Sequence, residues 1–186
     1  MALTATMYHL EIALSDVDRG VYEALDLRLA RHPSESLRYL LTRTFAYCLS
    51  YEDGIAFSKG GLSNAEEAPI TVRDPTGLLR AWIDIGAPSA ERLHKASKAA
   101  DRVALFTAAE LGPLERELRT RTIHRLAELA VWKLEPAFLD ALEPKLERNT
   151  KLELVRTEGQ LYVTLGGKVM EGTIRETRLG EANEAG

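Results

Sequence analysis

The sequence contains little that would support a disulfide or a histidine-ligated metal. It has one cysteine, Cys48, so no disulfide can form within the chain. Its four histidines, at positions 9, 32, 94 and 124, lack the spacing that a zinc site requires. Cys48 lies among apolar residues at helical spacing, which favours a small buried side chain over a reactive thiol. These features exclude zinc sites built from cysteine or histidine clusters and fit a reducing cytoplasm.

The sequence also lacks a long apolar run and an excess of positive charge. We therefore expect neither a membrane-spanning segment nor a secretory leader. The chain has 24 Lys and Arg against 28 Asp and Glu, a net charge of −4, whereas dedicated nucleic-acid binders are usually basic. With 186 residues, 45% of them hydrophobic, we expect one globular domain over residues 1–178 and a disordered polar tail over residues 179–186.

Hydrophobic periodicity predicts the elements of the N-terminal half. Alternating apolar residues between positions 3 and 30 predict a β-hairpin with its turn at Ser15–Gly20. A helical stripe follows, for which Ser34 is the expected N-cap, with Glu35 in the first turn and Gly54 at the end. Short extended segments are then expected at residues 55–58, 70–73 and 78–85.

The C-terminal half shows the same alternation of strand and helix patterns. Helices are predicted over residues 88–100, 114–122 and 136–147, the last interrupted near Pro144. A strand is predicted at residues 103–107, and a second within the ambiguous segment 124–134. A hairpin with its turn at Glu158–Gly159 ends the predicted structure.

Asp84 raises a chemical question because it lies between Ile83 and Ile85 in a segment suited to burial. Asp74–Gly77 has the residue order of a type I turn, and uninterrupted pairing outward from that turn places Glu67 opposite Asp84. Two facing carboxylates favour a shared cation or proton, and oxygen ligands suit Mg²⁺ or Mn²⁺. Alternatively, Glu67 belongs to the loop, and Asp84 faces solvent or meets a basic side chain.

Several motifs together resemble the YaeQ family of bacterial proteins over nearly the whole chain. They are "LARHPSE" at residues 29–35, Arg43, "AEEAP" at 65–69, "WIDIG" at 82–86 followed by Pro88, and "ERLHKASKAADRVALFT" at 91–107. The resemblance implies an α/β fold, a variant of the PD-(D/E)XK nuclease fold with a mixed sheet flanked by helices. It also implies an acidic site at the edge of two core strands, to which Glu67, Asp84 and Glu35 would contribute.

The chain departs from the superfamily pattern at the lysine, because Gly86 stands two positions after Asp84. In related folds the lysine can move to the following helix, which makes Lys95 or Lys98 the candidate. An ordinary helical ion pair with Glu91 also accounts for Lys95.

Two further basic residues are candidates for binding a phosphate or for balancing negative charge. Arg43 could bind a phosphate or merely neutralise the acid cluster, and Lys59 beside two glycines could contact a phosphate or simply be solvated. The resulting hypothesis is a Mg²⁺- or Mn²⁺-dependent nuclease acting on nucleic acid. The alternative is a degenerate nuclease fold that serves as a non-catalytic binding or regulatory module.

Overall fold

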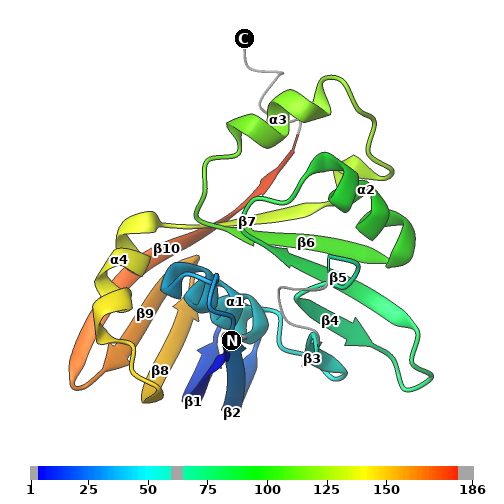
Figure 1. Ribbon diagram of the computed structural model, residues 1–186. Coiled ribbons are helices and arrows are strands. Elements are labelled where there is room, and N and C mark those ends of the chain that lie inside the picture. Colours follow the sequence, from blue (N-terminus) through cyan, green and yellow to red (C-terminus); the bar gives the residue numbers. More distant parts are fainter. Residues whose placement is uncertain (1–3, 60–64, 180–186) are drawn as a thin grey trace. The chain divides into compact units, whose positions relative to one another are not determined.

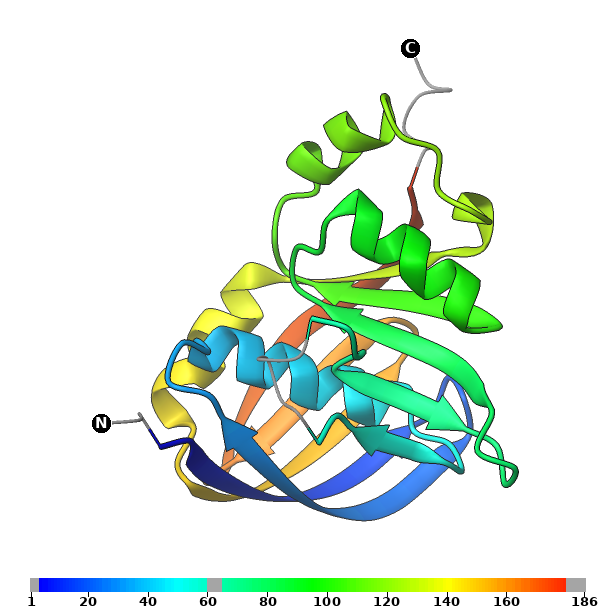
Figure 2. The same ribbon diagram turned by 45° about the vertical axis from the view of Figure 1, so that its right-hand side comes forward.

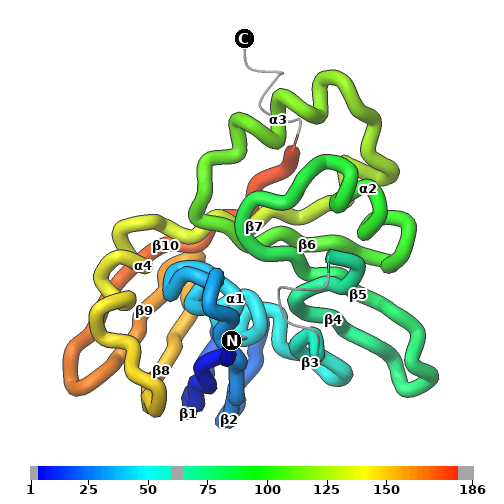
Figure 3. Tube along the Cα trace, viewed as in Figure 1, coloured from blue at the N-terminus to red at the C-terminus, as the bar shows by residue number. Residues whose placement is uncertain are grey.

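The computed structural model describes residues 4–59 and 65–179 (Figure 1, Figure 3). Contacts divide the chain into two compact units, and in each unit the strands form both parallel and antiparallel pairs. Unit 1 combines residues 1–49 with 134–175, and unit 2 combines residues 50–133 with 176–186. The expected α/β class is confirmed. The tail from residue 180 lies outside the described residues, whereas Leu179 is buried.

The sheet of unit 1 begins with the predicted N-terminal hairpin. Strands β1 (Thr6–Asp16) and β2 (Val21–Arg31) pair antiparallel along their whole length. β1 also pairs in parallel with β8 (Asn149–Thr157), which forms the predicted second hairpin with β9 (Gln160–Leu165). An unpredicted strand, β10 (Lys168–Arg178), pairs with β9. The order in this unit is therefore β2-β1-β8-β9-β10.

Two helices cover one face of the unit 1 sheet. Helices α1 (Leu37–Leu49) and α4 (Pro136–Leu142) lie side by side over it (Figure 2), with the Phe45 and Phe138 ring centroids 5.5 Å apart. A 3₁₀ turn at Glu143–Lys145 follows α4, so the predicted interruption near Pro144 is confirmed. The covered face carries alternate leucines of β1 and β2, all buried. The opposite face, called the outer face below, is partly or fully solvent-exposed and carries charged residues such as Asp26 and Arg28.

Helix α1 begins two residues later than the sequence pattern predicted. The Ser36 hydroxyl accepts the Tyr39 amide at 3.1 Å, so Ser36 rather than Ser34 is the cap. Residues 32–35 instead form a turn, in which the Glu35 amide donates to the His32 carbonyl at 2.8 Å. Glu35 therefore precedes the helix. The helix also ends at Leu49, before Gly54, because residues 50–54 lead into the next strand.

The strands of unit 2 also pair in both orientations. Strands β3 (Ile55–Phe57), β4 (Ile70–Arg73) and β5 (Leu79–Ile85) pair antiparallel with one another in that order. Strand β6 (Arg102–Thr107) pairs in parallel with β5, and β7 (Ala130–Leu134) pairs in parallel with β6. Residues 130–133 of β7 belong to unit 2. These strands confirm the predicted extended segments, with β7 taking the C-terminal part of segment 124–134.

Helices connect the parallel strands of unit 2 along the chain. Helix α2 (Ala90–Ala99), whose N-cap is Ser89, joins β5 to β6 and lies within the predicted helix over residues 88–100. Helix α3 (Gly112–Leu118) and a 3₁₀ turn at Leu126–Glu128 join β6 to β7. The sequence predicted a helix over residues 114–122; the observed α3 starts two residues earlier, at Gly112, and ends earlier, at Leu118. The core between α2 and the sheet contains Trp82, Leu93, Ala96, Leu105 and Val131.

The predicted turn between β4 and β5 is confirmed, but the predicted strand register is wrong. The Gly77 amide donates to the Asp74 carbonyl at 2.8 Å, as a type I turn requires. Leu78 is held within the turn region, and the ladder shifts between Val72 and Arg73. Ile70 consequently pairs with Ile83 instead of Ala81. This shift removes Glu67 from the position opposite Asp84.

Candidate functional site around Asp84

The Asp84 carboxylate is buried and accepts hydrogen bonds from three donors of unit 2. Arg92 on α2 donates through Nε to Asp84 Oδ2 at 2.6 Å. The Trp82 indole, two residues earlier on the same face of β5, donates to this oxygen at 3.2 Å. The other oxygen accepts the Ile85 amide at 3.2 Å. Asp84 is only 2% exposed, so its charge is compensated by the neighbouring guanidinium, as burial demands.

Arg92 also binds the backbone of the segment that precedes β4. Its Nη1 donates to the Ala65 carbonyl at 2.5 Å and its Nη2 to the Glu67 carbonyl at 2.9 Å. The guanidinium carbon lies 5.4 Å from the centre of the Trp82 ring, within the range of a cation–π contact. One arginine thus joins β5, α2 and residues 65–67 around a buried acid.

Glu67 presents its backbone, rather than its carboxylate, to Arg92. Its side chain is exposed and accepts a hydrogen bond from the Ser58 hydroxyl at 2.8 Å. The facing pair of carboxylates expected from the hairpin register is therefore not formed by strand pairing.

The candidate lysines of unit 2 lie on its surface. Lys95 forms an ion pair with Glu66, while Glu91, its expected helical partner, lies 3.6 Å from Arg121. Lys95 therefore reaches the same 65–67 segment as Arg92. Lys98, in the last turn of α2, and Lys59 are both exposed.

Glu35 and Arg43 belong to unit 1, where they form a buried ion pair with Glu35 Oε1 and Arg43 Nη2 3.1 Å apart. The Arg43 Nη2 also donates to the Ala30 carbonyl at 3.0 Å, and the His32 amide donates to Glu35 Oε2 at 3.1 Å. Burial raises the pKa of the Glu35 carboxyl, and the Arg43 charge partly opposes that rise. Arg43 thus neutralises an acid, one of the two roles expected for it.

The donor set around Asp84 does not suit a hard divalent cation. Mg²⁺ and Mn²⁺ require several oxygen ligands, but Asp84 Oδ2 already contacts a guanidinium and an indole N–H. Across residues 4–59 and 65–179, no three His, Cys, Asp or Glu side chains are grouped so as to hold a metal ion.

Arg92 is the central residue of the site, and sequence reasoning missed it. It lies within the "ERLHKASKAADRVALFT" motif, eight residues after Asp84. A signal was available, because a strand followed directly by a helix brings the helix's first turns back beside the strand end. A buried acid at that strand end needs a cation from those turns.

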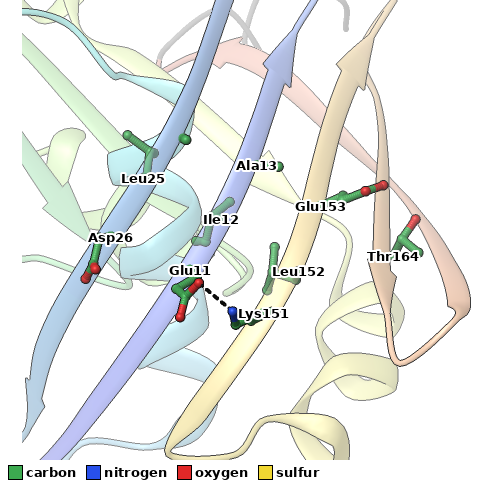
Figure 4. A pocket seen from close by; sticks show the side chains of 10 residues that line it. Glu11, Ile12, Ala13, Leu25, Asp26, Lys151, Leu152, Glu153 and Thr164 are labelled. Carbon is green, nitrogen blue, oxygen red and sulfur yellow. Dashed lines mark ion pairs between the residues drawn. The ribbon is translucent and has the colours of Figure 1, made fainter.

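Unit 1 carries a separate hollow of about 520 Å³ on its outer face (Figure 4). Ala13 on β1 lies opposite Ala24 on β2, and these two small side chains leave space between longer ones. The polar residues around them are Glu11, Asp26, Lys151, Glu153 and Thr164. Glu11 and Lys151 form an ion pair at 3.0 Å. The residues that line the hollow include none of the predicted site residues.

These observations define an α/β protein with mixed β-sheet in both units and an arginine-bound acid at the end of strand β5. The chain belongs to the YaeQ family: the family model described as "YaeQ protein" matches residues 1–174. The expectation drawn from the sequence motifs is confirmed. No helix in the described part of the chain is both long and apolar enough to span a membrane.

The chain is similar to known members of that family over most of its length. It is 29% identical over 168 residues to proteins from Escherichia coli K12 and Salmonella typhi, each called "Uncharacterized protein YaeQ"; the match covers 88% of this chain and 91% of each relative. The crystal structure of YaeQ from Pseudomonas syringae superposes with a TM-score of 0.84 at 29% identity, covering 92% of this chain and 95% of that one. The crystal structure of YaeQ from Xanthomonas axonopodis pv. citri superposes with a TM-score of 0.83 at 28% identity, covering 94% of this chain and 99% of that one.

Proposed function

We propose that this chain is a non-catalytic binding or regulatory module built on an architecture similar to that of the PD-(D/E)XK nucleases. The observation that carries the proposal is the 2.6 Å contact between Arg92 Nε and Asp84 Oδ2. In this arrangement Asp84, one of the two expected catalytic acids, has a structural role. It anchors α2 and residues 65–67 to β5.

Three other observations support this proposal. Gly86 occupies the position at which the nuclease pattern places its lysine, and Glu67 is hydrogen-bonded to Ser58 in the loop. The overall charge of −4 also provides no general attraction for a polyanion.

The second candidate function is a Mg²⁺- or Mn²⁺-dependent nuclease that hydrolyses phosphodiester bonds in nucleic acid. One observation favours it: Glu66, Glu67, Asp84 and Lys95 are carried by segments that Arg92 and Lys95 hold together in unit 2. In this candidate Lys95 is the substitute for the motif lysine. Lys59 and Lys98 are then solvent-facing cations available to phosphate, and Glu35 and Arg43 are a separate buried pair.

Two experiments distinguish the non-catalytic module from the nuclease. They are calorimetric titration of wild type and Asp84→Asn with Mn²⁺, and cleavage assays on single- and double-stranded DNA and RNA. The matched control is Asp101→Asn, which removes an exposed acid paired with Arg80. A non-catalytic module should show neither Mn²⁺ binding that depends on Asp84 nor cleavage by any of the three proteins. The proposal is overturned if wild type and Asp101→Asn cleave with Mn²⁺ while a folded Asp84→Asn does not.

A further inference from the structure

Strand β2 is a long and regular sheet edge. It lies at the end of the strand order, and among the described residues its ladder partner is β1. Its eleven residues pair with β1 without a bulge and contain no proline. Proteins usually blunt such edges with bulges, prolines, short strands or charged side chains, because unpaired N–H and C=O groups are a template for another strand. β2 is long and has no bulge or proline, and its exposed charges are of both signs.

The side chains of β2 separate cleanly onto the two faces of the sheet. Leu25, Leu27 and Leu29 are buried beneath the helices, at 8%, 6% and 2% exposure. Asp26 and Arg28 alternate with them on the outer face and are exposed. Asp26 Oδ1 lies 2.8 Å from His9 Nε2, yet the Asp26 side chain remains 65% exposed. An acid and a base thus stand two positions apart on one face of an open edge.

We propose that β2 pairs antiparallel with β2 of a second copy of this chain, with Leu27 on the two-fold axis. Opposed residues in an antiparallel pair share a face, so this register places Asp26 of each copy opposite Arg28 of the other. The interface then gains the same opposite-charge pair twice, which is the self-complementarity that a two-fold contact requires. This inference is independent of the function proposed for the Asp84 site.

The charges select this register over its neighbours. Sliding the second strand by two residues in one direction sets Asp26 opposite Asp26, and in the other direction sets Arg28 opposite Arg28. Both alternatives bring like charges together, which is unfavourable. A slide by one residue would turn the buried leucines to the outer face. At the far end, the Ala30 carbonyl already accepts a hydrogen bond from Arg43, so the backbone ladder is expected chiefly over residues 25–29.

The test is a charge reversal followed by sedimentation equilibrium over a wide concentration range. Wild type should be a dimer, and Asp26→Arg and Arg28→Asp should each weaken self-association by about tenfold or more. The doubly exchanged chain, Asp26→Arg with Arg28→Asp, should regain the wild-type dissociation constant. Mixing the two single variants should give a heterodimer, because one then carries two bases and the other two acids on this edge.

Glu153→Arg is the matched control, because it reverses an exposed outer-face charge on β8, away from the β2 edge. It should dimerise like wild type, with circular dichroism confirming that every variant is folded. The proposal is overturned if wild type is a monomer throughout. It is equally overturned if the single variants dimerise unchanged or if the exchanged chain fails to recover.

Discussion

The Phe138 ring on α4 occupies the space that a Cβ atom would need at Gly172 on β10. Three atoms of that side chain are the nearest neighbours of such a Cβ, and Phe138 is itself 1% exposed. The absence of a side chain at position 172 therefore lets the helix pack closely on the sheet.

Gly172→Ala should destabilise the protein by about 2 kcal/mol, because a well-packed core accommodates an added methyl group only by shifting. Urea unfolding measures the change. Phe138→Leu in the same chain should recover part of the loss, giving a favourable coupling in the double-mutant cycle. Additive effects of the two substitutions would show that the ring and position 172 do not compete for space.

Arg92→Ala should cost about 3 kcal/mol of unfolding free energy. The substitution leaves the Asp84 carboxylate, 3% exposed in its side chain, without its compensating cation. Lys98→Ala, on the exposed side of the same helix, controls for helix propensity and should change stability by less than about 0.5 kcal/mol. Denaturant midpoints that are the same for both variants would contradict a structural role for the Arg92–Asp84 pair.

Glu35 should make a pH-dependent contribution to stability. Burial raises the pKa of its carboxyl above the ordinary value of 4.5, so the folded protein binds the proton more tightly than the unfolded chain. The Glu35 contribution is therefore fully present below pH 4.5 and is lost as the pH rises through the folded-state pKa. The stability of wild type relative to Glu35→Gln should increase as the pH falls from 7 toward 4.5. Chemical unfolding at several pH values gives this difference, and a constant difference would contradict the shift.

Cys48 should resist thiol reagents while the protein is folded. Its side chain is completely buried, and burial raises the pKa of the thiol to about 12, so almost no thiolate exists at neutral pH. Ellman's reagent should react with it only at the rate of unfolding, and rapidly in denaturant. Immediate reaction of the native protein would mean that α1 opens readily.

Local patterns in the sequence predicted most of the strands and helices correctly. The alternating leucines of β1 and β2, the turn at Asp74–Gly77 and the helix predicted over residues 88–100 each depend on neighbours a few residues away. β10 was missed because charged and polar residues, together with Gly172, interrupt its apolar alternation. Its place in the sheet depends on pairing with β9 and packing against α4.

The acidic site was predicted less well because strand register and side-chain choice depend on distant contacts. Leu78 lies in the turn region, and a further irregularity falls between Val72 and Arg73; each shifts the pairing by one residue, and together they separate Glu67 from the position opposite Asp84. The burial of Asp84 was correctly taken to demand a partner. The cation that pairs with Asp84 is Arg92. Its position depends on how α2 packs against β5, which the sequence pattern alone does not reveal.

The parallel pairing of β1 with β8 affects how the chain folds as it is synthesised. His9 pairs with Asn149, and Asp18 in the first hairpin turn accepts the Glu158 amide from 140 residues further on. The N-terminal hairpin must therefore leave the ribosome long before its neighbouring strand exists. Until then its leucine-rich face lacks much of its final cover, a situation in which nascent chains depend on chaperones.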